Sequence, residues 1–421
     1  MISKITIYLE GGIILLKPKF YFLCLLVILF TLLLSPYGLI SKNIEVEAKD
    51  LGDVNKEQRL LVFYNATIID GTGAKPIENG VILVEGERIK RVGQSNQVEV
   101  PKGVIEINLK GKTILPGFIN SHVHHAYTEK NLKNWLNAGV TTVRDLSPQI
   151  EVTEAIAKRD KFNQRADLSR VVSASPILGV PDGYGNSTFN SMQEAKEMVN
   201  GYIDDNVEII KFAITDFDQN RSWEMPTFEQ VKTIVDTAHA RGIRTSVHIT
   251  NSQHLQWAID LGVDDIAHMI VNLLDDKTCN KIIAKDIYWV PTLELWKRIS
   301  KMYNINYDFI ARINLVKFYK AGGKVALGTD FAGYKADFDS GFPITEVKLM
   351  KKAGMSNMDI IIAGTKNAAF VCDREEDLGT LEEGKIADML IVSGNPLEDI
   401  EDLENRQMVV HNGEIVVDKE D

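Results

Sequence analysis

Cysteine is scarce in this chain, and its scarcity excludes a disulfide-based fold. The 421 residues contain only three cysteines, Cys24, Cys279 and Cys372. Three cysteines cannot make a disulfide framework, and their spacing is not that of a zinc–thiolate site. We read them as buried or unreactive thiols. A single bridge between Cys279 and Cys372 stays open if the compartment is oxidising.

Clustered positive charge is also missing. The chain has 47 Lys and Arg against 58 Asp and Glu, a formal net charge of −11, with no dense basic run. Nucleic-acid binding requires a basic surface, so we exclude nucleic acid as a partner. Internal repeats and low-complexity tracts are absent. With 45% hydrophobic and 25% charged residues, the composition is that of a globular protein large enough for more than one domain.

One long apolar run stands near the N-terminus. Lys17 and Lys19 precede an almost unbroken apolar stretch, residues 20–34, which with residues 37–40 reaches about the length that spans a bilayer. A basic flank followed by an apolar stretch is typical of export signals. We predict that residues 1–40 are a signal peptide or a membrane anchor, and that they are the only part to meet a membrane. The remainder would be exported, extracellular or periplasmic, after a linker at residues 41–58.

Short strand patterns mark both ends of the remaining chain. Alternating apolar runs separated by Gly-rich turns are typical of an antiparallel sheet. In the head they cover residues 61–64, 66–69, 80–84, 88–92 and 104–107, and in the tail residues 389–392, 407–410 and 414–417. The last two runs flank the hairpin turn Asn412-Gly413. We predict that the head (residues 59–115) and the tail (residues 373–421) form one small β-sandwich.

Strand and helix patterns alternate between residues 116 and 372. The apolar β-runs cover residues 117–122, 141–144, 171–174, 207–213, 245–249, 265–269, 288–291 and 324–328. Helical patterns between them include residues 191–204, 227–241 and 309–321. Such alternation indicates parallel βα units, and eight of them suggest a closed barrel. We therefore predict an α/β fold, a (β/α)8 TIM barrel over residues 116–372.

Two histidines stand at the end of the first β-run. His122 and His124 are two residues apart, and strand side chains two residues apart face the same side. Both imidazoles could therefore bind one ion at the mouth of the barrel. Alone, this spacing is weak evidence.

Four further polar side chains stand at or near the ends of later β-runs. Lys211 lies in the fourth run, His248 and His268 end the fifth and the sixth, and Asp330 follows the eighth. Active sites of TIM barrels are built at these strand ends. Imidazole and carboxylate ligands suit Zn²⁺ and similar divalent ions. Any one of these residues could be structural, but their joint placement predicts a metal site.

Four motifs stand out between residue 61 and the end: residues 116–124 (PGFINSHVH), 139–145 (GVTTVRD), 328–330 (GTD) and 384–388 (GKIAD). With these motifs, residues from about 61 to the end resemble the amidohydrolase superfamily, close to its imidazolonepropionase-like and prolidase-like branches. The family pattern often has Asp two residues before the first His, where this chain has Asn120.

The resemblance implies a hydrolase with two divalent metal ions, with Zn²⁺ the expected metal. Lys211 would be carboxylated by CO₂ and bridge both ions, which explains a lysine on an apolar strand. The ligands would be His122, His124 and Asp330 for the first ion, and His248 and His268 for the second.

The predicted reaction is hydrolysis of a C–N bond in a small molecule by a hydroxide between the ions. Asp330 would be the catalytic residue that carries the proton to the leaving nitrogen. Dipeptides or N-acyl amino acids are the expected substrates, and Tyr127 and Tyr184 are candidate substrate contacts. Arg144, inside a strand, is expected to make a buried ion pair. By the same resemblance, a homo-oligomer is an expected state, with no interface residue identified.

Two other readings stay open. In the first, Lys211 is an ordinary lysine, and the protein is a one-metal cyclic-amide hydrolase or deaminase. In the second, the chain is a non-catalytic binding protein on the same fold. The number of bound metal ions separates these readings. The two-metal hydrolase would hold two ions with the bridging lysine, the one-metal hydrolase or deaminase one ion, and a binding protein would need no metal.

Overall fold

The computed structural model describes residues 5–9, 12–16, 59–218 and 221–419. The chain divides into two compact units, Met1–Arg59 and Leu60–Asp421. In the first unit, β1 (Ile5–Leu9) pairs antiparallel with β2 (Gly12–Leu16). Of the predicted export segment, residues 1–40, only these two strands are described, and its apolar run and the predicted linker at residues 41–58 lie outside the described residues. Within the described residues, the structure holds no helix with the length and apolarity that a membrane crossing needs.

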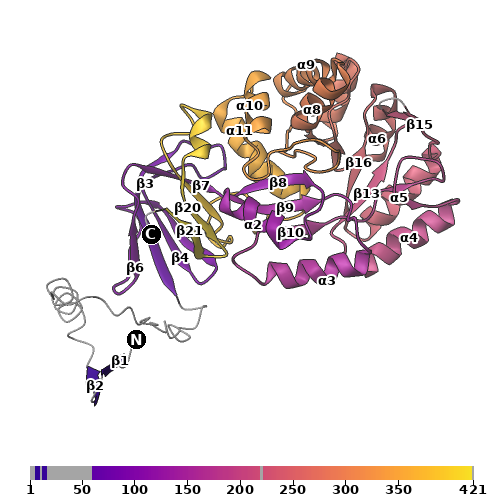
Figure 1. Ribbon diagram of the computed structural model, residues 1–421. Helices are drawn as coiled ribbons and strands as arrows, with labels where there is room; N and C mark the ends of the chain where they lie inside the picture. The colour runs from indigo at the N-terminus through magenta and orange to yellow at the C-terminus, as the bar shows by residue number, and fades with distance from the viewer. Residues whose placement is uncertain (1–4, 10–11, 17–58, 219–220, 420–421) are drawn as a thin grey trace, which may run out of the picture. The chain divides into compact units, whose positions relative to one another are not determined.

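Strands from the head and the tail of the second unit share one eight-stranded sheet (Figure 1). Its order is β21-β20-β19-β7-β3-β4-β5, with β6 beside β3. The antiparallel pairing of β7 with β19 joins head to tail. The bounds are β3 (Leu60–Ile68), β4 (Ile77–Glu85), β5 (Arg88–Gln94), β6 (Ile105–Asn108), β7 (Lys112–Pro116), β19 (Met389–Ser393), β20 (Arg406–His411) and β21 (Glu414–Asp418). A joint sheet is thus observed, and the two-layer sandwich stays a prediction.

Parallel strands form the centre of the second unit. One sheet has the order β10-β9-β8 and another the order β12-β11-β13-β16-β17-β18. The bounds are β8 (Phe118–Val123), β9 (Val140–Asp145), β10 (Arg170–Ser173), β11 (Leu178–Gly179), β12 (Ser187–Thr188), β13 (Ile209–Ala213), β16 (Arg244–His248), β17 (Asp265–Ala267) and β18 (Tyr288–Val290). Seven of the eight predicted β-runs are confirmed as strands, within two residues at each end.

The eighth predicted run, residues 324–328, is not a regular strand, and that prediction was wrong in detail. Its backbone is nevertheless bonded on both sides. Val325 makes a parallel bridge with Trp289, and Ser121 N donates to the carbonyl oxygen of Leu327 at 2.9 Å. A further bridge joins Ala174 to Ile209, between the two sheets. Hydrogen bonds therefore run from β8 through β18 to residue 327 and back to β8.

Helices follow most of these strands, which confirms the α/β alternation. They are α2 (Glu129–Asn137), α3 (Val152–Asn163), α4 (Met192–Asp204), α5 (Phe228–Ala240), α6 (Leu255–Leu261), α7 (Asp276–Ala284), α8 (Leu293–Tyr303), α9 (Tyr307–Lys320), α10 (Ile344–Lys352), α11 (Asn357–Gly364) and α12 (Lys366–Val371). Short elements are β14 (Phe217–Asp218), β15 (Arg221–Ser222), η3 (Ser252–His254) and η4 (Ile400–Glu404). The start of α5 has a physical cause, since Thr227 and Gln230 form a reciprocal capping box.

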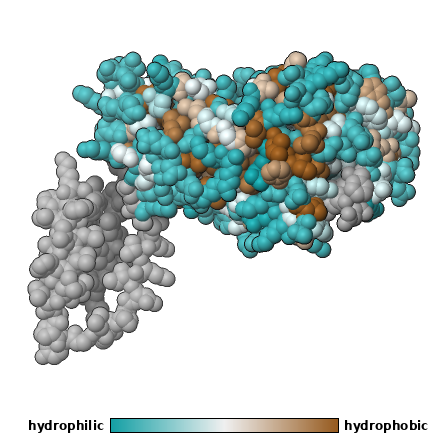
Figure 2. All heavy atoms as spheres, turned by 90° about the horizontal axis from the view of Figure 1, so that it is seen from above, coloured by the Kyte–Doolittle hydropathy of each residue, from teal (hydrophilic) through white to brown (hydrophobic). Residues whose placement is uncertain are grey.

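A buried ion pair joins two of the central strands. The side chain of Arg144 on β9 is fully buried and pairs with Asp265 on β17 at 2.7 Å, which confirms the predicted buried ion pair. Seen from above, the surface is largely hydrophilic with hydrophobic areas set among it (Figure 2). Exposed apolar side chains on α8 and α9 include Met302, Phe309 and Ile313.

Candidate active site

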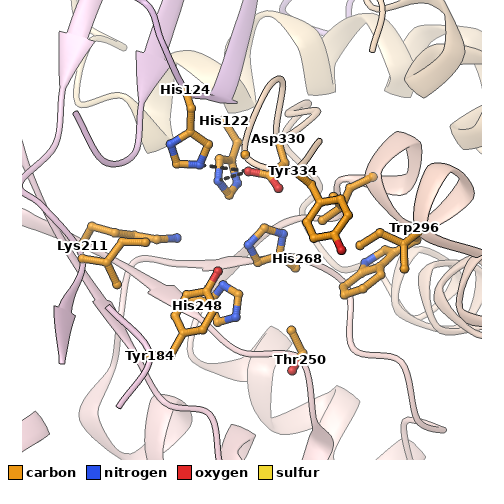
Figure 3. A pocket seen from close by; sticks show the side chains of 14 residues that line it. His122, His124, Tyr184, Lys211, His248, Thr250, His268, Trp296, Asp330 and Tyr334 are labelled. Carbon is orange, nitrogen blue, oxygen red and sulfur yellow. Dashed lines mark ion pairs between the residues drawn. The ribbon is translucent and has the colours of Figure 1, made fainter. Parts of the chain in front are cut away.

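One cavity collects all the side chains predicted as metal ligands (Figure 3). Three of them come from different strands: His122 from near the end of β8, His248 from the end of β16 and Lys211 from the middle of β13. The other three come just after such elements: His124 follows β8, His268 follows β17, and Asp330 comes shortly after residues 324–328. All six are buried.

Asp330 lies against the two histidines of the first strand. Its Oδ1 is 3.1 Å from His122 Nε2 and 3.0 Å from His124 Nε2. The other ring nitrogen of His124, Nδ1, is 3.3 Å from the carbonyl oxygen of Ser147. A carbonyl only accepts, so Nδ1 must carry the hydrogen, and the lone pair of Nε2 in a neutral ring then faces the carboxylate. At this distance a cation lies between the two atoms, either the proton of a charged His124 ring or a metal ion that replaces that proton.

The pKa values of His124 and Asp330 also reflect the attraction between the carboxylate and positive charge. Burial would lower the pKa of His124, but hydrogen bonding and charge from Asp330 outweigh it and raise that pKa. Burial would raise the pKa of Asp330, but the charges and hydrogen bonds of His122 and His124 hold it well below the usual range. The site therefore keeps an ionised carboxylate that attracts a cation.

The second pair of histidines offers free ring nitrogens. The rings of His248 and His268 are 4.6 Å apart, centre to centre, and those of His268 and His122 are 4.8 Å apart. His268 Nδ1 is 3.0 Å from Thr292 Oγ1, and His248 Nε2 is buried without a hydrogen-bond partner. Burial holds the pKa of both rings well below the usual value. Both are therefore neutral imidazoles, the form that binds metals.

Lys211 is a buried amine with nothing to pair with. Its side chain is among the largest that are fully buried, and Nζ has no hydrogen-bond partner. Burial lowers the pKa of Lys211 to about 7. A buried charge without a partner is costly, so at neutral pH roughly half of this amine is neutral and nucleophilic.

These donors fit a divalent metal ion. Ligand atoms of His122, His268 and Asp330 all lie within 4.8 Å of one another. Neutral imidazoles, a carboxylate and orphaned polar atoms in one buried cavity are the donor set that Zn²⁺ prefers.

Local structure around the site is built to hold Asp330. The backbone of Asp330 is left-handed (φ 60°), as is that of His268 (φ 70°), a strain typical of functional sites. Asp330 N donates to the carbonyl oxygen of His122 at 2.8 Å. Asn120 Nδ2 donates to Thr329 Oγ1 at 2.9 Å, so Asn120 ties β8 to the residue before Asp330.

Two glycines make room for the ligands. A Cβ on Gly333 would lie 2.3 Å from Asp330 Oδ1, and a Cβ on Gly328 would lie 2.7 Å from His122 Cβ. Both distances are shorter than the contact that a non-bonded Cβ can make with a carbon or oxygen atom. The motif Gly328-Thr329-Asp330 therefore needs its glycine for the close approach to His122.

The rest of the cavity wall is aromatic and apolar. Tyr184 stacks on the ring of His248 at 4.1 Å, so this candidate substrate contact lies in the cavity. Tyr127 does not line it: the residue is buried, and its hydroxyl donates to Ser173 Oγ at 2.9 Å. That placement argues against Tyr127 as a substrate contact in this structure. Residues that sequence reasoning missed are Ile177, Thr250, Leu295, Trp296, Ile299, Gly333 and Tyr334.

The chain belongs to the amidohydrolase family, whose model matches residues 113–416. This membership and the site together define a metal-dependent hydrolase. The chain is similar to ochratoxinase of Aspergillus niger, with 22% identity covering 84% of this chain and 85% of that one. It is also similar to imidazolonepropionase of Alkaliphilus metalliredigens, with 22% identity, covering 82% of this chain and 91% of that one.

A solved structure supports the fold. The crystal structure of a Xaa-Pro dipeptidase with bound methionine in its active site matches with a TM-score of 0.74 and 24% identity. The match covers 85% of this chain and 99% of the dipeptidase. At this identity the likeness shows the fold alone, and it implies a TIM barrel.

Proposed function

We propose that this protein hydrolyses C–N bonds of amide type with two divalent metal ions. His122, His124 and Asp330 would hold the first ion, and His248 and His268 the second. Lys211, carboxylated by CO₂, would be a ligand of both ions. The central strands would close as a (β/α)8 barrel that carries this site at its mouth, beside a sandwich of head and tail strands.

The observation that carries the proposal is the set of buried polar atoms without protein partners. In the described part of the chain, His122 Nδ1, His248 Nε2 and Lys211 Nζ are buried without a hydrogen-bond partner. Orphaned buried polar groups are rare and costly, so they are expected to have a ligand. A carbamate on Lys211 would turn an unpaired amine into an anionic oxygen donor, and the neutral fraction of this amine can react with CO₂.

The residues of this chain supply the remaining chemistry. Bound divalent ions would activate water and polarise the carbonyl. Asp330, ionised and buried, would take a proton from the attacking water. It would then give that proton to the leaving nitrogen, so that the C–N bond breaks into a carboxylate and an amine. Dipeptides and N-acyl amino acids, and the neutral amides considered below, contain such bonds.

A one-metal hydrolase or deaminase is the second candidate. The compact cluster of His122, His268 and Asp330 favours it, because these three suffice for one ion. Imidazolonepropionase is among the similar proteins. In this alternative Lys211 would stay an unmodified amine.

The activity is tested by removing and restoring the metal. Purified protein would be stripped with a chelator and assayed against linear amides, dipeptides, N-acyl amino acids and cyclic amides. We expect activity on linear amides to vanish and to return with Zn²⁺. Activity that survives complete metal removal would exclude the proposal, and activity confined to cyclic amides or to deamination would favour the second candidate.

The setting of the enzyme belongs to the same proposal. Residues 1–40 would direct export or anchor the chain, which rests on the lysine-flanked apolar run. The acidic net charge of −11 supports a small-molecule substrate over nucleic acid. A homo-oligomer stays a prediction.

A further inference from the structure

An apolar wall faces the ligand cluster. Leu295, Trp296 and Ile299 of α8 line the cavity, and Ile177 lines it after β10. Trp296 is 2% exposed, and its ring lies 6.2 Å from that of His268. In Figure 3, Trp296 and Tyr334 lie on the opposite side of His268 from Lys211. An apolar surface this close to the ligands would contact the substrate beside its scissile bond.

No free cation lines the cavity among the residues that the structure describes. Lys211 is the only Lys or Arg in the lining, and the proposed function uses it as a ligand. Nearby arginines are committed elsewhere. Arg298 of α8 pairs with Glu294 at 2.7 Å. The guanidinium of Arg221 is not among the lining groups and lies 3.7 Å over the ring of Trp223, which packs against Tyr184 at the cavity.

Free carboxylates need such a cation. A carboxylate that leaves water for a cavity is stabilised chiefly by a Lys or Arg partner. The other polar groups of the lining outside the ligand cluster are the uncharged hydroxyls of Tyr184, Thr250 and Tyr334. Two of them already have protein partners, Thr250 with Thr215 and Tyr334 with Tyr303. Hydroxyls suffice for an amide carbonyl but compensate a buried charge poorly.

We infer that the substrates are uncharged amides carrying a bulky apolar or aromatic group, rather than amides with a free carboxylate beside the scissile bond. The inference rests on the proposed function and narrows its substrate class to neutral amides, in place of the dipeptides and N-acyl amino acids predicted from the sequence. The apolar group would pack against Trp296, Leu295 and Ile299, and the scissile carbonyl would face the ligand cluster.

A matched pair of substrates tests the charge. N-benzoylphenethylamine and N-benzoylphenylalanine share the scissile amide and both rings, and differ only in the carboxylate. With the metal-loaded full-length protein, we expect kcat/KM for the neutral compound to be higher by about tenfold or more. Equal values, or a preference for the acid, would overturn the inference and leave C–N hydrolysis intact.

A charge placed in the wall gives a second test. Ile177 is half-buried, so a long side chain there can be accommodated. Ile177→Arg should lower the ratio of neutral to acidic kcat/KM by about tenfold. Ile177→Gln, similar in length but uncharged, should leave the ratio unchanged. The same change in both variants, or in neither, would contradict the assignment.

Trp296 tests the apolar contact. Trp296→Ala should raise KM for N-benzoylphenethylamine more than for N-acetylmethylamine, with Trp296→Phe intermediate and the metal content unchanged. Trp257→Ala on α6, whose ring packs on Phe228, is the control and should alter neither. A uniform loss for both substrates would contradict a specificity role. If no amide of any kind is cleaved while metal is bound, the proposed function itself fails.

Discussion

At the scale of single residues, Asp330 is a buried carboxylate held by contacts on several sides. Its oxygen faces two ring nitrogens at 3.1 and 3.0 Å, and its backbone N–H is bonded to the carbonyl of His122. Gly333 leaves no room beyond its own hydrogen beside the carboxylate. A group held this way can bind an ion and move a proton without rearranging.

Removing this carboxylate should abolish turnover and spare the fold. For Asp330→Ala we expect kcat to fall by about 10²- to 10⁴-fold, the range for a general acid–base group. Circular dichroism should be unchanged. Asp337→Ala, an exposed carboxylate nearby in the chain, is the control and should keep full activity. Turnover retained in Asp330→Ala would remove Asp330 from the reaction.

A methyl group at Gly333 should displace the neighbouring carboxylate of Asp330, the predicted metal ligand, while leaving Asp330 itself unchanged. The added Cβ would meet Asp330 Oδ1 at 2.3 Å, so the carboxylate must move away. We expect Gly333→Ala to lose bound metal, measured by elemental analysis, with little change in Tm. Gly201→Ala in α4 has open space around its Cβ and should keep its metal. Full metal content in Gly333→Ala would argue against Asp330 as a ligand.

Sequence reasoning brought His122, His124 and Lys211 to the cavity because strand alternation and strand ends are local signals. Trp296 and Tyr334 escaped it, because their place depends on how α8 and the loop after Asp330 fold over the site. Tyr127 was misjudged for a similar reason. It follows the ligand pair in sequence, yet its hydroxyl turns to Ser173.

At the scale of elements, α8 is held from outside its own sequence. Glu346 of α10 is fully buried, and its carboxylate accepts the N–H groups of Leu293 at 2.9 Å and Glu294 at 2.6 Å. These are orphan donors at the start of a helix, and the two oxygens of Glu346 satisfy them. Because Thr292 precedes this helix and contacts His268, Glu346 links α10 to the site wall.

The pH dependence of stability should report Glu346. Burial raises the pKa of Glu346 from 4.5 to about 8, against the hydrogen bonds from Glu294 and Leu293. The folded state then keeps a proton that the unfolded chain has released. Its contribution is complete below about pH 4.5 and is lost as the pH rises through about 8.

Urea unfolding of the wild type and Glu346→Gln at several pH values measures this. The variant cannot titrate at this position. We expect the stability of the wild type relative to the variant to fall by up to about 1.4 kcal/mol per pH unit between those limits. A relative stability that is flat, or that rises with pH, would contradict a raised pKa.

Element boundaries were largely predictable where a pattern is local. β13, β16 and α5 match their predicted runs because periodicity and capping define them. The β3 strand was predicted as two runs broken near Asn65, whose left-handed backbone (φ 62°) the strand absorbs as a bulge. Residues 324–328 have strand-like neighbours but only isolated pairing, which depends on partners distant in the sequence.

At the scale of the whole molecule, strands from both ends of the second unit close one sheet beside the central strands. Arg170 of β10 pairs with Asp388 at 2.7 Å, and both side chains are largely buried. This ion pair ties the central strands to the start of the tail, so the site and the sheet are expected to unfold together.

Export is a prediction about the whole chain, and the apolar run on which it rests lies outside the described residues. Deleting residues 1–40 should leave the protein in the cytoplasm, whereas the full chain should be found outside it or at the membrane. Deleting residues 41–58 instead should leave export intact. Cell fractionation with an antibody to the second unit measures this, and a full-length chain in the cytoplasm would refute the signal.

The central claim, a two-metal site that depends on Lys211, is tested most directly by counting metal ions per chain. Elemental analysis of the purified protein should give about two divalent ions per chain, falling sharply in Lys211→Ala. Lys285→Ala, which removes an exposed lysine, should change nothing. One ion per chain, unaffected by Lys211→Ala, would contradict the carboxylated bridge and assign the protein to the one-metal hydrolases and deaminases.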